Sequence, residues 1–507
     1  MDTMQNENQV RRWDMYEISL EGPQTGNPFK DVQLRARFEL ENSSVEVKGF
    51  YDGRGVYKIR FMPDREGKWS YQTLSNVGNL DGLNGGFICT PPEKSNHGPI
   101  HVHKQHHFSY ADGTPFFVMG TTAYAWTYRP EEIRERTLDS FSRYGFNKIR
   151  MLFFPKHYGD GQYIDVSYDP PVFPFRGEKN NFDFQYFNVQ YFQNFEKRVA
   201  ELRDRGIEAD VILFHFYDFE HWGIDVGMSA EEDLFYLDYL IARLAAYRNV
   251  WWSLANEYDL LVEGNRQLRV VLDRKDWDAI GRYIKANDPY SHPRSVHNVP
   301  FGVIYPDAPW LTHVSYQHPN TYSLLMELKR SFDKPVINDE YQYEGNVPQN
   351  WGNASPELEL TRHWMAAMAG GYATHGEAYR IDDNSKDIFW SYGGDMHGQS
   401  PRRLKFMKQI LESCPYQDME PDLQKSEGRD RFCLRKGAEL YLYFQTPACK
   451  DKGNLFLGLP EGDGGQFDIE VYDAWNCWLH TRLSSQAGVI GLDVPPWAVI
   501  KAVHTKN

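Results

Sequence analysis

The spacing of apolar and polar positions divides the chain into two outer regions and a long central region. Residues 13–98 alternate between apolar and polar side chains, as strands with one buried face do, and turn signals such as Asp52-Gly53 and Gly85-Gly86 separate the runs. We predict that residues 1–98 form an immunoglobulin-like β-sandwich. Short alternating runs return in residues 421–507, which we predict to form a small C-terminal β-sandwich.

The central region has a different rhythm, because short apolar runs alternate with longer patterns that have the period of an amphipathic helix. This alternation predicts a (β/α)8 TIM barrel over residues 99–420, flanked by the two β domains. A doubly wound sheet is the competing fold, but no glycine-rich phosphate-binding turn follows any run. The eight predicted strands lie at 116–120, 146–154, 207–216, 250–255, 294–298, 313–317, 335–341 and 372–378.

Two of these strands end in a glutamate. The run Val250–Ala255 is followed by Asn256-Glu257, and the strand at 335–341 carries Glu340. The carboxyl ends of the strands form the active face of a TIM barrel. Two carboxyl groups facing each other across such a mouth suit hydrolysis of a glycosidic bond, with Glu257 as general acid/base and Glu340 as nucleophile. A single strand-end glutamate is more often only solvated, so the pairing is what favours catalysis.

Further polar residues follow the same strand ends and are predicted to bind substrate. A single arginine or histidine on a strand is more often a satisfied core group, so the prediction depends on their convergence at one rim. Arg150 or a tyrosine hydroxyl would keep Glu340 ionised, and Asn256 would donate to a sugar hydroxyl. The predicted substrate-binding residues at the strand ends are Arg150, His215, Asn256, His297, Tyr316, His318, His375 and Glu377.

The order of these residues resembles the clan A retaining glycoside hydrolases typified by family 5. In that clan the acid/base follows an asparagine on the fourth strand and the nucleophile ends the seventh, which matches Asn256-Glu257 and Glu340 here. More closely, several segments resemble bacterial glycosidases with an immunoglobulin-like N-terminal domain and a C-terminal β domain. The resemblance implies glycosidase activity but no particular sugar. The segments are 339–346, 363–364, 370–377, 393–394 and 398–401.

The resemblance has one departure and leaves rivals for the nucleophile. Clan members place a tryptophan on the eighth strand beneath the sugar, whereas this strand carries His375 and Glu377, so Trp390 and then Trp126 are predicted as the platform. Asp339, Glu344 and Glu377 are rivals of Glu340. Asp339 is disfavoured because strand alternation would point it to the opposite side, and Glu344 because it lies four residues beyond the strand end.

Two other functions are weighed against a glycosidase. The cluster His101, His103, His106 and His107 suggests a metal-dependent hydrolase, but it precedes the first barrel strand in a connecting β segment, so a solvated strand face is favoured. A carbohydrate-binding protein on a decayed barrel is the other alternative, although a binder does not need both glutamates. We expect no cofactor and no metal.

Composition narrows the setting. The 507 residues are enough for two or three domains, and a net charge of −15 disfavours nucleic-acid and anionic-membrane partners. Five cysteines without a CxxC spacing, and an N-terminus without an apolar segment, favour a reduced protein of the cytoplasm unless a leader has been removed. We expect a carbohydrate substrate, namely small β-linked glycosides or oligosaccharides cleaved from their ends. The sequence does not determine which sugar is bound or whether the protein forms a homo-oligomer.

Overall fold

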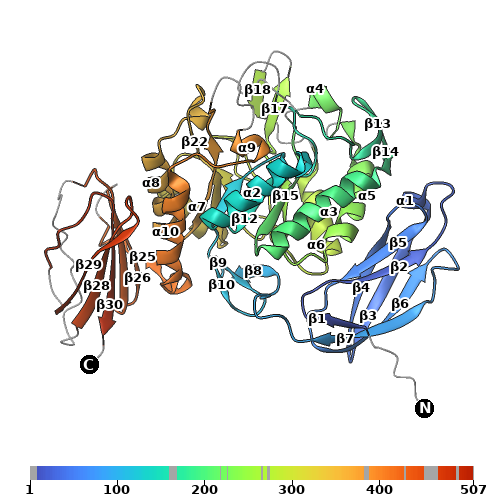
Figure 1. Ribbon diagram of the computed structural model, residues 1–507, viewed down its shortest axis with the longest axis horizontal. Helices are drawn as coiled ribbons and strands as arrows, with labels where there is room; N and C mark the ends of the chain where they lie inside the picture. The colour runs from blue at the N-terminus through green and yellow to red at the C-terminus, as the bar shows by residue number, and fades with distance from the viewer. Residues whose placement is uncertain are drawn as a thin grey trace.

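The computed structural model has a central barrel with a β region on each flank (Figure 1). It describes residues 8–158, 168–216, 219–224, 227–263, 267–270, 275–381, 388–426, 430–449, 466–486 and 490–505. The N-terminal and C-terminal β regions lie on opposite sides of the barrel, so the barrel carries the contacts that hold both.

The described part of the N-terminal region is a seven-stranded sheet in the order β1-β7-β6-β3-β4-β5-β2. Its pairs are antiparallel except β1 with β7. β3 alternates buried and exposed residues along its length, and its Phe38 stacks on Phe61 with ring centroids 4.1 Å apart. The elements are β1 (Gln9–Arg11), β2 (Tyr16–Glu21), α1 (Pro28–Asp31), β3 (Leu34–Leu40), β4 (Ser43–Tyr51), β5 (Val56–Phe61), β6 (Gly67–Ser75) and β7 (Asn84–Thr90).

Eight parallel strands in the described residues form the predicted barrel, in the order β19-β16-β15-β12-β11-β23-β21-β20. The ring closes where the N–H of Thr312, just before β20, donates to the carbonyl of Arg294 on β19 at 3.0 Å. These strands are buried on both faces and rich in apolar residues, and charged residues among them such as Lys148 and Arg150 are paired inside the barrel. Their bounds are β11 (Gly120–Thr122), β12 (Lys148–Leu152), β15 (Glu208–Phe214), β16 (Val250–Ala255), β19 (Arg294–Ser295), β20 (Val314–Gln317), β21 (Val336–Glu340) and β23 (Tyr372–His375).

The first barrel strand is not where the sequence placed it. The apolar run at 116–120 was predicted to be that strand, but the strand begins only at its last residue, Gly120. A side chain at Gly120 would lie 2.7 Å from Thr374 of β23, so glycine permits the close approach of β11 and β23. The hydrophobic periodicity of the sequence cannot reveal this contact, because β11 and β23 are the first and the last strands of the barrel along the chain.

Helices follow most barrel strands and cover the outside of the barrel (Figure 1). The predicted start of one of them is confirmed, since Ser229 and Glu232 form a capping box at the N-terminus of α5. The main helices are α2 (Glu131–Tyr144), α3 (Val189–Asp204), α5 (Ala230–Leu244), α6 (Trp277–Asn287), α7 (Ser323–Phe332), α8 (Pro356–Met368) and α10 (Ser400–Glu412). Shorter elements in the loops are α4 (Phe219–Trp222), α9 (Phe389–Tyr392), β13 (Phe175–Glu178), β14 (Asn181–Phe187), β17 (Leu260–Glu263), β18 (Gln267–Val270), β22 (Glu344–Gly345) and β24 (Glu377–Ala378).

A small antiparallel sheet closes the N-terminal end of the barrel. It consists of β8 (Ile100–His103), β9 (His107–Tyr110) and β10 (Pro115–Phe116). The ring of Phe108 packs 4.9 Å from Trp251 and 5.7 Å from Tyr372, which lie at the starts of β16 and β23. The carboxyl ends of the barrel strands, at the other end, therefore hold the open face.

Buried ion pairs fasten the N-terminal sheet to the barrel. Arg243 of α5 donates to Glu196 of α3 at 2.5 Å and to Asp52, which follows β4, at 2.7 Å. Arg60 of β5 lies 2.9 Å from the same Glu196 carboxylate. All four side chains are less than 10% exposed. Because an unpaired charge at this depth is costly, the ion pairs fix the sheet on the barrel.

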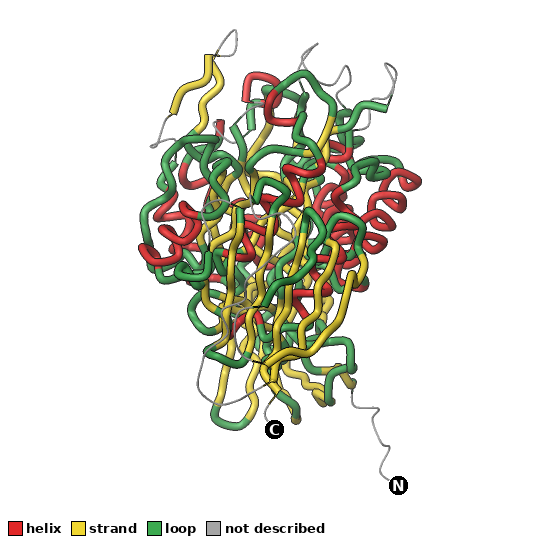
Figure 2. The backbone as a smooth tube through the Cα atoms, turned by 90° about the vertical axis from the view of Figure 1, so that its left-hand side faces the viewer, coloured by secondary structure: helices red, strands yellow, loops and turns green. Residues whose placement is uncertain are grey.

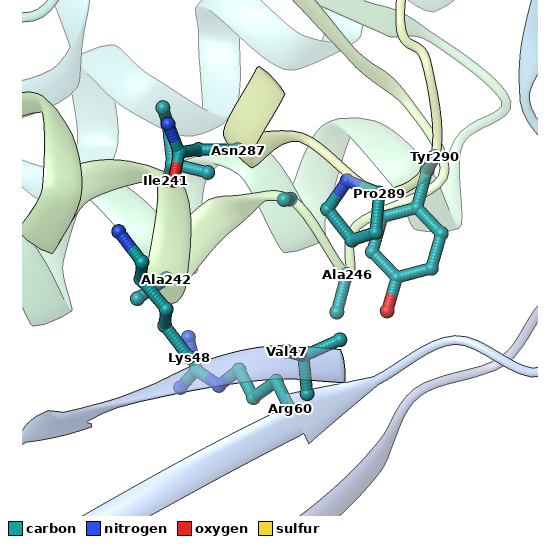
Figure 3. A pocket seen from close by; sticks show the side chains of 10 residues that line it. Val47, Lys48, Arg60, Ile241, Ala242, Ala246, Asn287, Pro289 and Tyr290 are labelled. Carbon is teal, nitrogen blue, oxygen red and sulfur yellow. The ribbon is translucent and has the colours of Figure 1, made fainter. Parts of the chain in front are cut away.

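The pocket in Figure 3 lies in this interface. β4 and β5 contribute one wall through residues such as Lys48 and Arg60, and the end of α5 and the segment containing Tyr290 contribute the other. Its volume of about 20 Å³ has room for little more than a water molecule. The pocket is therefore a gap between two domains rather than a substrate site.

The described C-terminal residues form a six-stranded antiparallel sheet in the order β25-β26-β27-β30-β28-β29, which faces the viewer in Figure 2. The sheet rests on the barrel helices, where Phe444 stacks on Trp364 of α8 at 5.2 Å and Trp475 lies 3.6 Å beneath the Arg403 guanidinium of α10. The strands are β25 (Glu420–Pro421), β26 (Arg431–Lys436), β27 (Leu440–Gln445), β28 (Gln466–Asp473), β29 (Trp478–Gln486) and β30 (Ala498–Thr505).

The cysteines agree with the sequence reading. All five lie in the described ranges, none is in a disulfide, and four are buried. In the described part of the chain, no helix combines the length and the apolar character that crossing a membrane requires.

Candidate active site

Glu340 ends β21 at the open face and is buried. Its Oε1 accepts a hydrogen bond from Nη1 of Arg150 at 2.8 Å and another from the hydroxyl of Tyr124. Burial raises the pKa of the Glu340 carboxyl to about 8, and the nearby Tyr343 hydroxyl acts against this. The Arg150 charge also favours the ionised form. The arginine and both tyrosines therefore act against the effect of burial on this carboxyl group.

A bulge in β21 determines where this carboxylate points. Tyr316 of β20 lies opposite Asn338, but the next residue, Gln317, lies opposite Glu340, so Asp339 is an extra residue in the ladder. A bulge interrupts strand alternation and re-aims side chains. Asp339 and Glu340 both approach Arg150, at 4.0 and 2.8 Å. The expectation that alternation sends Asp339 to the opposite side is therefore wrong.

Asp339 instead belongs to the floor of the site. Its carboxylate lies 3.2 Å from Nζ of Lys148, and it accepts hydrogen bonds from the hydroxyls of Ser315 and Thr374, both at 2.6 Å. Burial would raise the pKa of Asp339, but the charges of Lys148 and Arg150 hold it well below its ordinary value. A carboxylate held by this many interior partners is a structural anion beneath Glu340.

Asn256 and Glu257 follow β16 and lie across from Glu340. Nη2 of Arg150 donates to Oδ1 of Asn256 at 2.5 Å, so one guanidinium joins the end of β16 to Glu340. Glu257 is half-buried and has a left-handed backbone (φ 48°), which costs a non-glycine residue about 1–2 kcal/mol. Such strain persists where the surrounding structure enforces it, often at functional sites.

Tyr343 lies near the end of the barrel that carries both glutamates. Burial raises the pKa of its hydroxyl well above the ordinary value, and the charges of Glu340 and, to a smaller extent, Glu257 raise it further. Both glutamates come at the carboxyl ends of barrel strands, Glu340 as the last residue of β21 and Glu257 two residues after β16. The two carboxyl groups therefore lie at the same open end of the barrel.

Trp390 lies beside these tyrosines, and Trp126 does not. The half-buried Trp390 ring is 5.9 Å from that of Tyr124 and 5.8 Å from that of Tyr343. Trp126 is fully buried and packs edge-on against Phe141 of α2 at 5.9 Å. Of the two predicted platforms, only Trp390 adjoins the residues around Glu340.

Two predicted histidines lie at the strand ends near Arg150. His215 directly follows β15 and is buried. His297 follows β19, is fully buried, and has a pKa far below its ordinary value because of burial and the Arg150 charge. Neither ring nitrogen of His297 has a hydrogen-bond partner among the described residues. Burial and the Arg150 charge thus favour a neutral imidazole at His297.

Two other predicted residues point away from the barrel interior. Ser315 and Thr374 face inward to Asp339, so their neighbours Tyr316 and His375 face outward. The Tyr316 hydroxyl donates to the Asn320 carbonyl at 3.3 Å. His375 contacts the Thr121 hydroxyl at 2.9 Å and stacks on Phe146 at 5.0 Å. Both predicted substrate contacts are therefore corrected to contacts in the layer between strands and helices.

Glu377 and Glu344 hold the start of α10. Glu377 accepts the N–H of Gly398 at 2.9 Å, and Glu344 accepts those of Gln399 and Ser400 at 2.7 and 2.9 Å. Carboxylates are stabilised at a helix N-terminus by its free N–H groups and dipole. Burial nevertheless raises the pKa of Glu377 to about 8. Glu377 is therefore corrected from a substrate ligand to a structural group, and both rivals of Glu340 have structural partners.

The four histidines proposed as a metal site diverge at the closed end of the barrel. Nδ1 of His107 lies 2.8 Å from the Tyr372 hydroxyl, and Nε2 of His106 lies 3.0 Å from Asp333. In the part of the chain that the structure describes, no group of three or more histidine, cysteine or acidic residues is arranged to hold a metal. The described residues therefore do not supply the ligand arrangement that a metal-dependent hydrolase at these histidines would need.

Two residues at the site were missed from the sequence. Tyr124 was missed because the first strand was predicted too early in the sequence. Tyr124 lies two residues beyond the observed end of β11 at Thr122, and its hydroxyl contacts Glu340. Tyr343 lies three residues after Glu340 in a loop, and only the tyrosine-rich segment 339–346 could have suggested it.

A parallel eight-stranded barrel with two strand-end glutamates, one of which is joined by an arginine to the asparagine that precedes the other, is the framework of a glycoside hydrolase. The particular family follows from comparison: the chain belongs to the apiosidase-like family, whose catalytic-domain model matches residues 102–418. A domain family of unknown function, DUF5060, matches residues 9–76. No curated protein matches the chain.

Solved structures give the same class. The chain is 35% identical to a candidate glycoside hydrolase from Bacteroides vulgatus ATCC 8482, with a TM-score of 0.87 over 98% of this chain and 100% of that one. A family 5 glycoside hydrolase from the same organism shares the fold at 17% identity, with a TM-score of 0.62 over 80% of this chain and 93% of that one. The chain thus shares the barrel fold of both proteins.

Proposed function

We propose that this protein is a retaining, exo-acting glycoside hydrolase that cleaves small β-linked glycosides or oligosaccharides. The observation that carries the proposal is that Arg150 joins Glu340 at the end of β21 to Asn256 at the end of β16, the residue directly before Glu257. A carbohydrate-binding role alone would leave unexplained a buried carboxylate supported by an arginine and two tyrosines.

The reaction would proceed in two displacements. The Glu340 carboxylate attacks the anomeric carbon while the Glu257 carboxyl gives its proton to the leaving-group oxygen. The glycosidic bond breaks, and an ester joins the sugar to Glu340. Glu257, now a carboxylate, then takes a proton from a water that attacks the same carbon and releases Glu340. Arg150 and Asn256 position the two acids, and Trp390 offers a face to the sugar ring.

The family description makes a terminal apiosyl residue the first sugar to test. Aryl β-glycosides of apiose should be compared with those of arabinofuranose, glucose, galactose, mannose, xylose and fucose. Early products followed by NMR should keep the configuration of the substrate, because two displacements restore it. An inverted first product would contradict the double displacement.

Replacing Glu257 with alanine should affect substrates according to their leaving group. Hydrolysis of a glycoside with a poor leaving group is expected to fall about 100-fold, because such a group must be protonated as it departs. A dinitrophenyl glycoside, whose leaving group needs no proton, should form the glycosyl ester at nearly the wild-type rate. Pre-steady-state release of dinitrophenol measures this. Equal losses for both substrates would remove Glu257 from the acid role.

Replacing Tyr343 with phenylalanine should move the pH profile. The hydroxyl favours the ionised form of Glu340, so its loss raises the pKa of that carboxyl further. Because Glu340 must be ionised to attack, the acidic limb of kcat/KM should shift to higher pH by up to about one unit, which corresponds to about 1.4 kcal/mol. Tyr341→Phe is the matched control, since its hydroxyl contacts His363 at 2.5 Å instead. An unmoved limb would contradict the contact.

Several finer features stay proposals. They are the immunoglobulin-like class of the N-terminal sheet, a sandwich at the C-terminus, the boundaries 1–98, 99–420 and 421–507, a cytoplasmic location, and independence of any cofactor. The resemblance to family 5 in particular also stays an expectation.

A further inference from the structure

The loop after β19 presents a phenylalanine to solvent at the open end of the barrel. Phe301 is 73% exposed, and its backbone has φ 59°, in the left-handed region. Single exposed apolar residues are ordinary on protein surfaces. A bulky side chain in the left-handed region is an outlier, because it crowds its own backbone. The combination of exposure and backbone strain distinguishes Phe301 from the other exposed apolar residues.

A buried carboxylate holds this loop in place. The two oxygens of Asp259 accept the N–H groups of Val299 and Val303, both at 2.7 Å, and Asp259 is fully buried. The Tyr258 hydroxyl donates to the Val303 carbonyl at 2.9 Å. A side chain at Gly302 would lie 2.2 Å from Asp259, so glycine is required for this approach. The loop is therefore built to hold Phe301 in one position.

His318 forms a second wall next to Phe301. The two rings meet edge to face with centroids 4.9 Å apart and an interplanar angle of 77°. Nδ1 of His318 accepts the N–H of Asn320 at 3.0 Å, so the proton of the neutral ring resides on Nε2. The pair thus combines an apolar aromatic face with a hydrogen-bond donor, which suits a ring that has one apolar face and polar edges.

The position of the loop relative to Glu257 indicates which part of a substrate it meets. Tyr258 and Asp259, which hold the loop, directly follow Glu257, so one short turn places both the carboxyl and the loop. A general acid adjoins the leaving-group oxygen that it protonates. Trp390 lies instead beside the tyrosines around Glu340, which bonds to the sugar. The loop is therefore on the leaving-group side.

We propose that Phe301 and His318 form a leaving-group subsite that binds a ring with a flat apolar face, either an aromatic aglycone or a second sugar. The assignment rests on the proposed function, because it uses Glu257 as the acid. The backbone strain at Phe301 is retained because the ring must stand upright at the mouth rather than fold onto the core.

The test compares substrates that share a sugar but differ in leaving group, namely aryl, disaccharide and methyl glycosides of the best sugar found in the panel. Phe301→Ala should lower kcat/KM for the aryl and disaccharide substrates about 3- to 10-fold, the size of an aromatic contact, and leave the methyl glycoside unchanged. Phe301→Trp should keep the wild-type preference for the aryl and disaccharide substrates over the methyl glycoside. Val303→Ala, on the same loop and 42% exposed, is the matched control.

A second variant separates binding from folding. Phe301→Gly removes both the ring and the backbone strain, so it should raise Tm while losing the same selectivity. A loss of selectivity accompanied by a lower Tm would indicate a structural role and overturn the proposal. If Phe301→Ala lowers kcat/KM more for the aryl glycoside than for the disaccharide, the subsite binds an aromatic aglycone. If it lowers kcat/KM more for the disaccharide, the subsite binds a second sugar.

Calorimetry with the Glu340→Gln protein distinguishes failure of the subsite from failure of the proposed function. If wild type hydrolyses the panel but Phe301→Ala treats all leaving groups equally, the subsite is wrong and the glycosidase stands. If wild type hydrolyses nothing yet Glu340→Gln binds the aryl glycoside more tightly than it binds the methyl glycoside, and Phe301→Ala abolishes that difference, the subsite stands without the activity. Absence of both hydrolysis and binding overturns both.

Discussion

Replacing Glu340 with glycine is expected to lower kcat by about 10⁵- to 10⁶-fold, the size typical for loss of a covalent nucleophile. The variant has no group to form the glycosyl ester, while Arg150, Asn256 and Glu257 remain. Added azide should restore turnover by attacking the anomeric carbon from the vacated side. The product would be a glycosyl azide of inverted configuration, and NMR of that product is the measurement.

The Glu257→Ala protein is the matched control for this experiment. Its Glu340 still forms the ester, so azide enters on the face where Glu257 would activate water, and the glycosyl azide keeps the substrate configuration. Opposite products from the two variants would assign both roles at once. Full activity of Glu340→Gly would remove Glu340 from the reaction and return the nucleophile question to Glu344 and Glu377.

The second large effect concerns stability. Lys148 is completely buried on β12, where its ammonium lies 2.5 Å from Asp210 and 3.2 Å from Asp339. Lys148→Met leaves these carboxylates without their main counter-charge, so the free energy of unfolding should fall by about 3–5 kcal/mol. Lys104→Met is the control, since Lys104 pairs with Asp418 on the surface and its loss should cost less than about 1 kcal/mol. Urea denaturation measures both.

The loss of unfolding free energy caused by Lys148→Met should also depend on pH in a defined direction. In wild type the pKa of Asp339 is held below its ordinary value, so its contribution to stability is complete at neutral pH and is lost only in strong acid. Without Lys148 that pKa rises, because Arg150, Ser315 and Thr374 alone then act against burial, and Asp339 takes up its proton at a higher pH than in wild type. The difference from wild type should therefore be largest at neutral pH and shrink in acid. A difference independent of pH would contradict the electrostatic cause.

Much of the barrel was predictable because its strands are buried on both faces and appear as continuous apolar runs. Val250–Ala255 was placed at its observed bounds for that reason. The error at 116–120 arose because apolar residues also pack beneath the barrel, where Phe116 belongs to β10 of the closing sheet. An apolar run indicates that its residues are buried, but it does not show whether they belong to a barrel strand or to a neighbouring element.

The site was predictable where a residue lies toward the carboxyl end of a strand. Arg150, Asn256 and Glu340 meet because the parallel strands open onto one rim, and Glu257 directly follows Asn256. Tyr316 and His375 were misread because facing inward or outward changes with a single residue of register. The bulge at Asp339 changes that register locally, and no pattern of apolar residues marks it.

The bridge made by Arg150 constrains how this protein can change. If a relative lost only Glu340, the buried Arg150 guanidinium would lose its nearer carboxylate and keep only Asp339 at 4.0 Å, so the fold would be penalised along with the chemistry. If it lost only Arg150, a buried carboxylate would become protonated and inert. Loss of either residue alone is therefore penalised, so we expect a change from enzyme to binding protein to need replacement at both positions.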